Sequence, residues 1–252
     1  MPENKDSSHL RILKIIEVIA FADQPRSPSD IAYELDIPKP TVHRIIAQLK
    51  LERYIQANPR GNLVPDVNLN KIAFGIIRGS RYKVIRQSIL QELADKIDET
   101  CGISVADGVD MVYYDQVMTD HLLRSNLPTG SRVPIYATAS GKLYLSRLSK
   151  AKRQKVLHHL PIKQLAKNTI TSVDGFEAEF KKIRKQGYAI DNEEFLNGMI
   201  AIAVPVLDNE GIMTSSLFVH SLTIRKSIDD LQPLFPLLRD TAKALSDIYD
   251  QH

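Results

Sequence analysis

The 252-residue sequence has one cysteine, no tryptophan and no long apolar run. A single cysteine, Cys101, excludes both an intramolecular disulfide and a zinc site built from several cysteines. The longest apolar runs, such as 199–206, have the length of a strand, whereas a membrane-spanning helix needs roughly 18 apolar residues. The N-terminal segment MPENKDSSHL lacks the basic and apolar regions of a secretory signal. These absences predict a cytoplasmic protein that does not enter a membrane.

Sequence motifs of catalysis and of cofactor binding are absent as well. The chain contains no G-x-S-x-G, H-E-x-x-H, Walker A or G-x-G-x-x-G pattern. Gly141-Lys142 does not belong to a phosphate-binding loop, because Tyr136 stands where that loop needs a glycine. The adjacent His158 and His159 lie on a basic segment, where solvation is expected rather than metal binding. We therefore predict no catalytic residue, no metal site and no cofactor.

The net positive charge of the chain is small, and all of it lies near the N-terminus. The formal net charge is +3. Residues 1–82 hold 12 basic and 9 acidic side chains, whereas residues 83–252 hold 21 of each. The segment from Pro38 to Pro65 contains one acidic residue, Glu52, and five basic residues, which are Lys39, Arg44, Lys50, Arg53 and Arg60. This asymmetry predicts two domains and a narrow basic surface on the first, of the kind that contacts nucleic-acid phosphates.

The first 66 residues follow the order of a winged helix-turn-helix. Residues 9–22 carry isoleucines at helical spacing, and Ser27-Pro28-Ser29-Asp30 supplies an N-cap, a first-turn proline and a first-turn acid for a second helix. A third helix is predicted to begin near Pro40, because the prolines there prevent the second helix from continuing. Residues 54–65 are typical of two strands joined by a turn at 58–61.

The third helix is predicted to be the recognition helix that contacts DNA bases. Its apolar stripe is buried against the second helix, so its first turn points outward and fits the major groove of B-DNA. Arg44 can reach a guanine edge, and Arg60 at the hairpin tip can follow the DNA backbone. The alternative is a three-helix domain whose basic face is merely solvated. The predicted DNA contacts are Ser27, Ser29, Lys39, Pro40, Thr41, His43, Arg44, Arg53 and Arg60.

Residues beyond the hairpin alternate helical and β-rich segments. Residues 67–80 are predicted as a linker helix, weakened by Gly75 and Gly79, at the point where the charge balance changes. The further predicted helices are 82–100, 137–148, 150–159, 173–186 and 229–250. The predicted strands are 102–108, 110–117, 121–127, 187–194, 200–208 and 212–220.

A helix start at Thr138-Ala139-Ser140 is the first candidate for a ligand site. Small residues at a helix N-terminus leave backbone N–H groups free, and such a terminus suits a carboxylate or a phosphate. The alternative is a plain N-cap without a ligand, which is the commoner use of serine and threonine there.

The sequence resembles the IclR family of bacterial transcription regulators. The segment SPSDIAYELDIPKPTVHRIIAQLKLERYI is similar to the family's DNA-binding domain, and GSRVPIYATASGKLYLS and QGYAIDNEEFLNGMIAIAVPVLDNEG are similar to its effector-binding domain. The resemblance covers nearly the whole chain. It implies a mixed α/β fold with a winged helix-turn-helix (1–66), a linker helix (67–81) and a GAF-like α/β effector domain with an antiparallel sheet (82–252). It also implies homodimers, often paired into tetramers, that bind palindromic operators on double-stranded DNA and respond to small metabolites.

The resemblance extends the ligand site beyond the helix start. It implies effector contacts from Thr138, Ala139, Ser140, Asp191, Ala201, Phe218, Val219 and His220. Family members that bind very small oxo-acids tend to have cysteine where Ala201 stands and serine where Phe218 and His220 stand. The departure predicts a small organic-acid effector that is larger or more aromatic than glyoxylate or pyruvate.

Several alternatives stay open at this point. Phe218 could fill the pocket, so that the domain senses nothing, and Asp191 could be an acid that caps a turn. The chain could also be a ligand-binding or enzyme-like module whose DNA-binding domain has lost its function.

Overall fold

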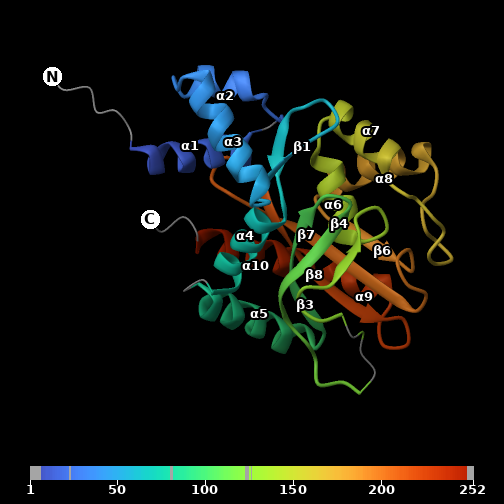
Figure 1. The fold of residues 1–252 in the computed structure, drawn as a ribbon. Helices are drawn as coiled ribbons and strands as arrows, with labels where there is room; N and C mark the ends of the chain where they lie inside the picture. Colours follow the sequence, from blue (N-terminus) through green and yellow to red (C-terminus); the bar gives the residue numbers. More distant parts are fainter. Residues whose placement is uncertain (1–6, 23, 80–81, 123–124, 126, 249–252) are drawn as a thin grey trace. The chain divides into compact units, whose positions relative to one another are not determined.

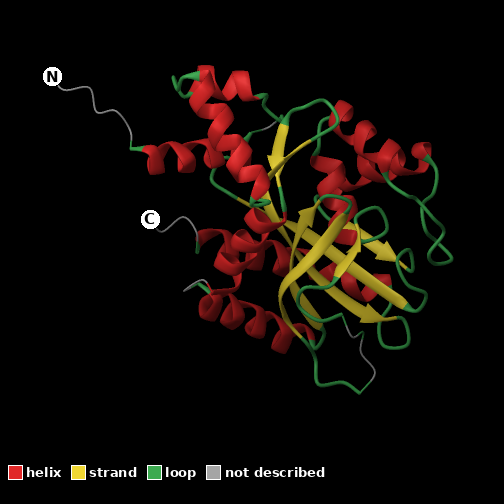
Figure 2. Ribbon diagram, viewed as in Figure 1, coloured by secondary structure: helices red, strands yellow, loops and turns green. Residues whose placement is uncertain are grey.

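The structure is a computed structural model that describes residues 7–22, 24–79, 82–122, 125 and 127–248. The chain divides into two compact units, residues 1–80 and 81–252. Helices dominate the first unit, and a large sheet lies at the centre of the second (Figure 2). Across the described ranges, no helix is long and apolar enough to span a membrane.

The first unit begins with three helices and a two-stranded wing (Figure 1). Helices α1 (Ser8–Phe21), α2 (Pro28–Glu34) and α3 (Lys39–Leu51) precede strands β1 (Ile55–Ala57) and β2 (Leu63–Pro65), which pair antiparallel. The apolar stripes of the helices meet in one core, formed by Ile15, Ile19, Ile31, Ala32, Ile37, Val42, Ile45, Ile46, Leu49, Ile55 and Leu63. The predicted winged helix-turn-helix is confirmed.

Local chemistry sets where the helices of this unit begin and end. The Ser27 hydroxyl accepts a hydrogen bond from the Asp30 N–H at 3.2 Å, and the Asp30 carboxylate accepts one from the Ser27 N–H at 3.1 Å. This reciprocal capping box starts α2. Helix α3 ends where Arg53 adopts a φ of 55° and the Tyr54 N–H bonds the Leu49 carbonyl. Helix α4 (Val67–Gly79) follows and occupies the predicted linker segment.

The second unit is built on a six-stranded antiparallel sheet in the order β5-β4-β3-β8-β7-β6. The antiparallel sheet implied by the family resemblance is thus confirmed. The strands are β3 (Thr100–Asp107), β4 (Asp110–Val117), β5 (Arg132–Pro134), β6 (Ala189–Asn192), β7 (Met199–Leu207) and β8 (Met213–Leu222).

Helices pack on both faces of this sheet. On one face lie α5 (Lys83–Ile97) and α10 (Phe235–Asp247), and on the other α6 (Ala139–Arg147) with α8 (Val173–Gln186) behind it; α7 (Lys150–His159) joins the second group. Because side chains alternate along a strand, Cys101 points to the α5 face, where its thiol lies 3.3 Å from the Leu90 carbonyl. Phe218 points to the α6 face.

The strand predicted at 121–127 is wrong for the part of that segment the structure describes. The sheet edge next to β4 is taken instead by β5, whose Val133 pairs with Met111. Ion pairs hold this edge, because Arg132 bonds Asp107 at 2.7 Å and Asp110 at 3.0 Å. These long-range contacts, rather than local apolar content, decide which segment joins the sheet.

The predicted closing helix is interrupted near its start. Helix α9 (Ile228–Leu231) gives way to a 3₁₀ turn (Gln232–Leu234) before α10 begins at Phe235. Pro233 and Pro236 have no N–H to donate, so a continuous α-helix through them would lose backbone bonds. Residues 249–250 of the predicted helix lie outside the described residues.

Candidate functional site

The first two turns of α3 present the predicted DNA contacts to solvent. Lys39, Pro40, His43 and Arg44 are exposed, and Thr41 is half-buried. The opposite side of the helix is buried in the core of the unit. Helix α3 begins without a side-chain cap, but Pro40 has no N–H, and the N–H groups of Thr41 and Val42 bond the Pro38 carbonyl at 2.9 and 3.1 Å. The exposed side chains on this face of α3 suit entry of the helix into a major groove.

Three other predicted contacts have structural roles or exposed positions around α3. Ser27 caps α2, and its hydroxyl also donates to the Asp30 carboxylate at 2.8 Å. Ser29 is exposed beside it. Arg53 is exposed and lies 3.7 Å from the Asp66 carboxylate, a surface pair that a phosphate can displace.

The tip of the wing is a tight turn between β1 and β2. The Asn58 side chain accepts from the N–H of Arg60 at 2.9 Å and of Asn62 at 3.1 Å. Gly61 has a φ of 79°, a conformation that other residues adopt with strain. The turn holds Arg60 exposed at the tip. An exposed arginine at the tip of this turn can contact a DNA backbone.

Six predicted effector residues meet in one cavity of the second unit. These residues come from the start of α6 and from β6, β7 and β8: Thr138, Ala139, Ser140, Asp191, Ala201 and Phe218. Tyr113 and Met199 complete the lining and were missed by sequence reasoning. Met199 could have been found, because it is two residues before Ala201 and shares its sheet face. Tyr113 could not, because a β-bulge decides its face.

Two predicted effector residues do not line this cavity. Val219 pairs with Cys101 and Ile202, so its side chain lies on the α5 face of the sheet. Strand alternation thus removes the Val219 side chain from the predicted site. His220 is on the α6 face, but its ring lies behind Phe218, at a centroid distance of 5.6 Å. His220 lines a neighbouring cavity of about 10 Å³ with Thr100 and Ser125 among others.

Helix α6 starts against the backbone that precedes it. The Thr138 hydroxyl caps the helix by accepting from the Gly141 N–H at 3.2 Å. A Cβ atom on Gly141 would lie 1.9 Å from the Ile135 carbonyl oxygen, so any other residue would push the helix start away. For the N–H groups of Ala139 and Ser140, the described part of the chain offers no acceptor. Both residues line the cavity.

Asp191 is the acidic residue in the lining of the cavity. It is 1% exposed, and its Oδ1 accepts from the Glu194 N–H at 2.8 Å and the Phe195 N–H at 3.4 Å. Its Oδ2 has no hydrogen-bond partner among the described residues. Burial, assisted by the nearby Glu194 carboxylate, raises the pKa of Asp191 to about 7. Near neutral pH the carboxyl is therefore protonated in a large share of molecules and can donate a hydrogen bond.

A buried ion cluster supports the cavity from the α6 side. Lys142 is fully buried, and its Nζ lies 2.5 Å from Glu194 and 3.4 Å from Glu179. Burial raises the pKa of Glu194, and the Lys142 ammonium opposes that rise. Sequence reasoning used Lys142 only to reject a phosphate-binding loop, because a lysine on a short helix carries no local signal of burial.

Aromatic rings close the cavity. The rings of Tyr113 and Phe218 stack at a centroid distance of 4.5 Å. The remaining cavity has a volume of about 10 Å³, room for about one water molecule. An organic acid can enter only if side chains of the lining move.

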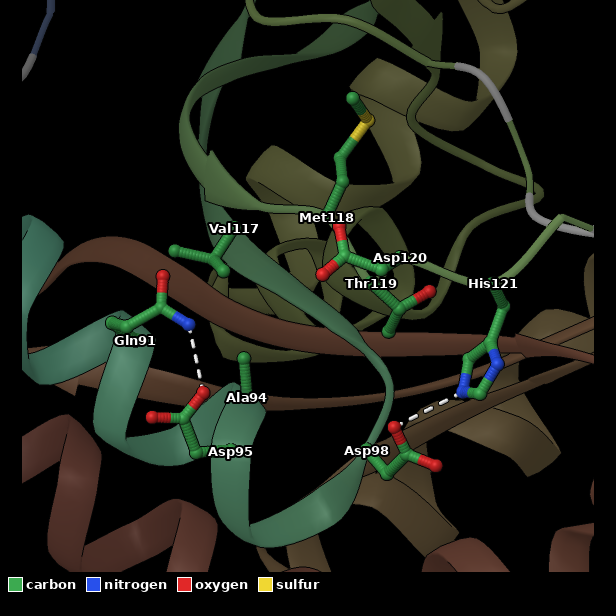
Figure 3. Close-up of a pocket in the computed structure, with 9 residues that line it drawn as sticks. All are labelled: Gln91, Ala94, Asp95, Asp98, Val117, Met118, Thr119, Asp120 and His121. Carbon is green, nitrogen blue, oxygen red and sulfur yellow. Dashed lines mark hydrogen bonds and ion pairs between the residues drawn. The ribbon is translucent and has the colours of Figure 1, made fainter.

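A larger hollow lies elsewhere, between α5 and the end of β4 (Figure 3). Its volume is about 400 Å³, and Asp95, Asp98 and Asp120 are part of its lining. Asp95 accepts from Gln91 at 2.8 Å, and Asp98 pairs with His121 at 3.0 Å (Figure 3). This acidic lining repels an organic acid. The described residues contain no cluster of three or more metal-ligating side chains here or elsewhere.

A winged helix-turn-helix followed by a domain with a buried polar cavity is the architecture of a ligand-responsive DNA-binding regulator. The family description "IclR helix-turn-helix domain" matches residues 8–59, and "Bacterial transcriptional regulator IclR C-terminal" matches residues 81–247. The chain belongs to the IclR family of transcription regulators, which confirms the resemblance read from the sequence. Its curated relatives are regulators, not enzymes.

Individual relatives agree with this assignment. The chain is 35% identical over 241 residues to "Probable transcriptional regulator SauR" of Cupriavidus necator, covering 95% of both chains. A transcriptional regulator of Rhodococcus sp. RHA1 is similar in structure, with a TM-score of 0.65, 26% identity and coverage of 95% of this chain and 96% of that one. The inducer-binding domain of a PobR double mutant from Acinetobacter, in complex with 3-hydroxybenzoic acid, has a TM-score of 0.62 and 31% identity, covering 65% of this chain and 97% of that one.

Proposed function

We propose that this protein is a sequence-specific regulator whose DNA affinity changes when a small organic acid binds in the cavity beside α6. The hydrogen-bond donors of the residues that line the cavity are the observation that supports an organic acid as the effector. The N–H groups of Ala139 and Ser140 and a protonated Asp191 carboxyl belong to residues that line one cavity, where each can donate a hydrogen bond to a bound carboxylate. The 3-hydroxybenzoic acid bound by the PobR domain supports the same class.

The closed cavity favours a switch over a static site. Because a cavity of about 10 Å³ must enlarge for an acid to enter, the bound and free forms of the domain differ in geometry. An effector can shift DNA affinity only if it binds the two forms differently. We infer that Phe218 displacement is the step that distinguishes them, rather than a sign that the domain senses nothing.

In this proposal, a buried ion pair transmits a movement at the cavity to the start of α5, the helix that follows the linker segment in the chain. Arg86 at the start of α5 bonds Asp115 on β4 at 2.7 Å, and Gln87 bonds the same carboxylate at 2.9 Å. A bulge at Tyr114, where the register shifts between Ile103 and Ser104, lets Tyr113 face the cavity while Asp115 faces α5. Movement of Tyr113 would therefore shift the start of α5, which follows the linker segment 67–81 in the chain.

The DNA target we infer is a palindromic operator bound by a homodimer, or by a tetramer of paired dimers, as the family resemblance implies. Two winged helices would read half-sites about one helical turn apart.

Binding of small acids to the full chain tests this function. We expect at least one member of a panel of aliphatic and aromatic carboxylic acids to raise the melting temperature, because a ligand of the native state stabilises it by mass action. The same acid should change the affinity for the protein's own promoter DNA by roughly 5–150-fold. If no acid stabilises the protein, the effector class is wrong; if an acid stabilises it without changing DNA affinity, the coupling is wrong.

Two arginines should differ in how they affect DNA binding. Arg44→Ala is expected to cost about 1–3 kcal/mol and to relax sequence preference, because it removes a base contact. Arg60→Ala should weaken all sequences alike and reduce the slope of log K against log salt by about 1 per subunit. Fluorescence anisotropy at several salt concentrations measures both effects.

The exposed Lys50 on the same helix provides the matched control, since Lys50→Ala removes one charge farther from the first turn of α3. Equal losses for Lys50→Ala and Arg44→Ala would contradict base reading by Arg44. A wild-type affinity that does not depend on salt or sequence would instead favour a ligand-binding module whose DNA-binding domain has lost its function.

A further inference from the structure

The longest stretch of the sequence without an acidic residue lies in the second unit, at 121–173. Residues 150–186, which include α7 and α8, hold ten basic and three acidic side chains, whereas the rest of 83–252 holds 11 basic and 18 acidic ones. The equal totals of basic and acidic residues over 83–252 therefore conceal one strongly basic segment inside an otherwise acidic domain.

Helices α7 and α8 are neighbours in the fold (Figure 1). The buried Arg153 of α7 donates to the Glu177 carboxylate of α8 at 3.1 and 2.8 Å, and its guanidinium lies 5.4 Å from the centre of the Phe180 ring. One side of each helix is buried by these contacts and by the apolar core around them. The lysines of both helices therefore lie on the sides that face solvent.

The three acidic residues of this segment are already engaged. Glu177 pairs with Arg153, Glu179 lies 3.4 Å from the buried Lys142, and Asp174 stands in the first turn of α8, where the helix dipole favours a carboxylate. Four exposed lysines, in contrast, have no ion-pair partner among the described residues, and they form what we call the α7–α8 basic surface: Lys155, Lys181, Lys182 and Lys185.

Helix α7 keeps positive charge at a position that disfavours it. Lys150 and Lys152 stand in its first turn, which has no acidic residue. Because the N-terminus of a helix carries a partial positive charge, lysines in the first turn reduce its stability. A local choice that opposes stability is expected where the residues serve a function.

We propose that the α7–α8 basic surface is a second DNA contact, which binds phosphates of double-stranded DNA without reading bases. A lysine ammonium suits this task, because phosphate contacts need positive charge but carry no sequence information directly. The first unit of the chain already binds DNA, and the linker segment tethers the second unit to it. Contacts that are weak by themselves then gain from a high effective concentration.

A second copy of the chain is the other anionic partner to weigh, since the second unit is acidic outside α7 and α8. Such a contact would join two unlike surfaces, and contacts of that kind produce rings or open filaments rather than a twofold dimer. DNA fits the surface without this consequence, so we favour DNA as the partner.

Replacement of three of these lysines by glutamine tests the surface in the full chain, because glutamine removes the charge and retains a similar helix propensity. The variant is Lys155→Gln/Lys181→Gln/Lys185→Gln. With a random-sequence duplex, its slope of log K against log salt should be shallower than that of wild type by about 1–3 per subunit, since each lost phosphate contact removes about 0.9. Fluorescence anisotropy at several salt concentrations measures this slope.

The matched control removes the same charge from exposed positions on α5 and α10, in the variant Lys83→Gln/Lys96→Gln/Lys243→Gln. It should keep the wild-type slope, and both triple variants should melt close to wild type, because they change only exposed side chains. Equal slopes for wild type and the α7–α8 variant, or equal reductions in both triple variants, would overturn the proposal. A wild-type slope combined with lost self-association in light scattering at low salt would instead assign the surface to contacts between copies.

A second measurement separates this surface from the winged helix. In an Arg44→Ala/Arg60→Ala background, residual binding to random-sequence DNA should persist, and adding the three α7–α8 substitutions should weaken it by about tenfold. Residual binding that is the same with and without these lysines would contradict a DNA contact in the second unit. No organic acid is present, so the result does not depend on the proposed effector.

Discussion

Lys142→Met is expected to destabilise the second unit by about 3–5 kcal/mol. The Lys142 side chain is fully buried against Glu194 and Glu179, with Nζ to carboxylate distances of 2.5 and 3.4 Å. Methionine keeps the length and most of the packing but removes the positive charge. Two acidic groups, one of them buried, are then left without a counter-charge, which costs far more than the loss of a surface ion pair. Denaturant unfolding of the full chain at pH 7 measures the change.

Two further variants separate charge from packing. Lys155→Met changes an exposed lysine on α7 and should alter the free energy of unfolding by no more than about 0.5 kcal/mol. Adding Glu194→Gln to Lys142→Met should recover part of the loss, because it removes one of the uncompensated carboxylates. A loss below about 1 kcal/mol for Lys142→Met would contradict the buried ion cluster.

Asp191→Asn is expected to stabilise the protein by up to about 4 kcal/mol above pH 7. Burial raises the pKa of Asp191 from 3.8 to about 7. Below pH 3.8 the carboxyl is neutral in both the folded and the unfolded chain, so it contributes no penalty. Between these values the unfolded chain loses the proton while the folded chain keeps it, and stability falls as pH rises. Asparagine removes this penalty and retains an oxygen for the Glu194 N–H.

The test is the difference in free energy of unfolding between Asp191→Asn and wild type from pH 4 to pH 8. The difference should grow with pH and level off above about pH 7. Asp247→Asn, at an exposed carboxyl near the end of α10, should show no comparable trend. A constant difference across this range would contradict the raised pKa. Stabilisation by removal of a carboxyl would also indicate that Asp191 is retained for function at a cost in stability.

Local sequence signals predicted the first unit well. Helix starts at Ser27-Pro28, helix-ending prolines near Pro40 and the turn at 58–61 act over three to five residues, so each can be read without knowing the fold. Exposure of Lys39, His43 and Arg44 also follows from the apolar spacing of α3, because a helix that buries one face exposes the other. The elements 150–159 and 173–186 match α7 and α8 for the same reason.

The effector cavity depends on contacts that no local pattern contains. The family resemblance predicted six of its residues, but strand register placed Val219 on the opposite face and His220 behind Phe218. The cavity wall contributed by Tyr113 depends on the bulge in β4, which inverts the side-chain order within that strand.

The sequence by itself determined the two-unit order, the helix periodicity, the caps and the basic helix, because these follow from short-range chemistry. Tertiary structure alone decided the burial of Lys142, the raised pKa of Asp191 and the closing of the cavity by Phe218 on Gly102. Each of these needs residues from strands or helices far apart in the chain to meet in a medium that excludes water. The surrounding structure, not the residue type, then sets charge, proton affinity and free volume.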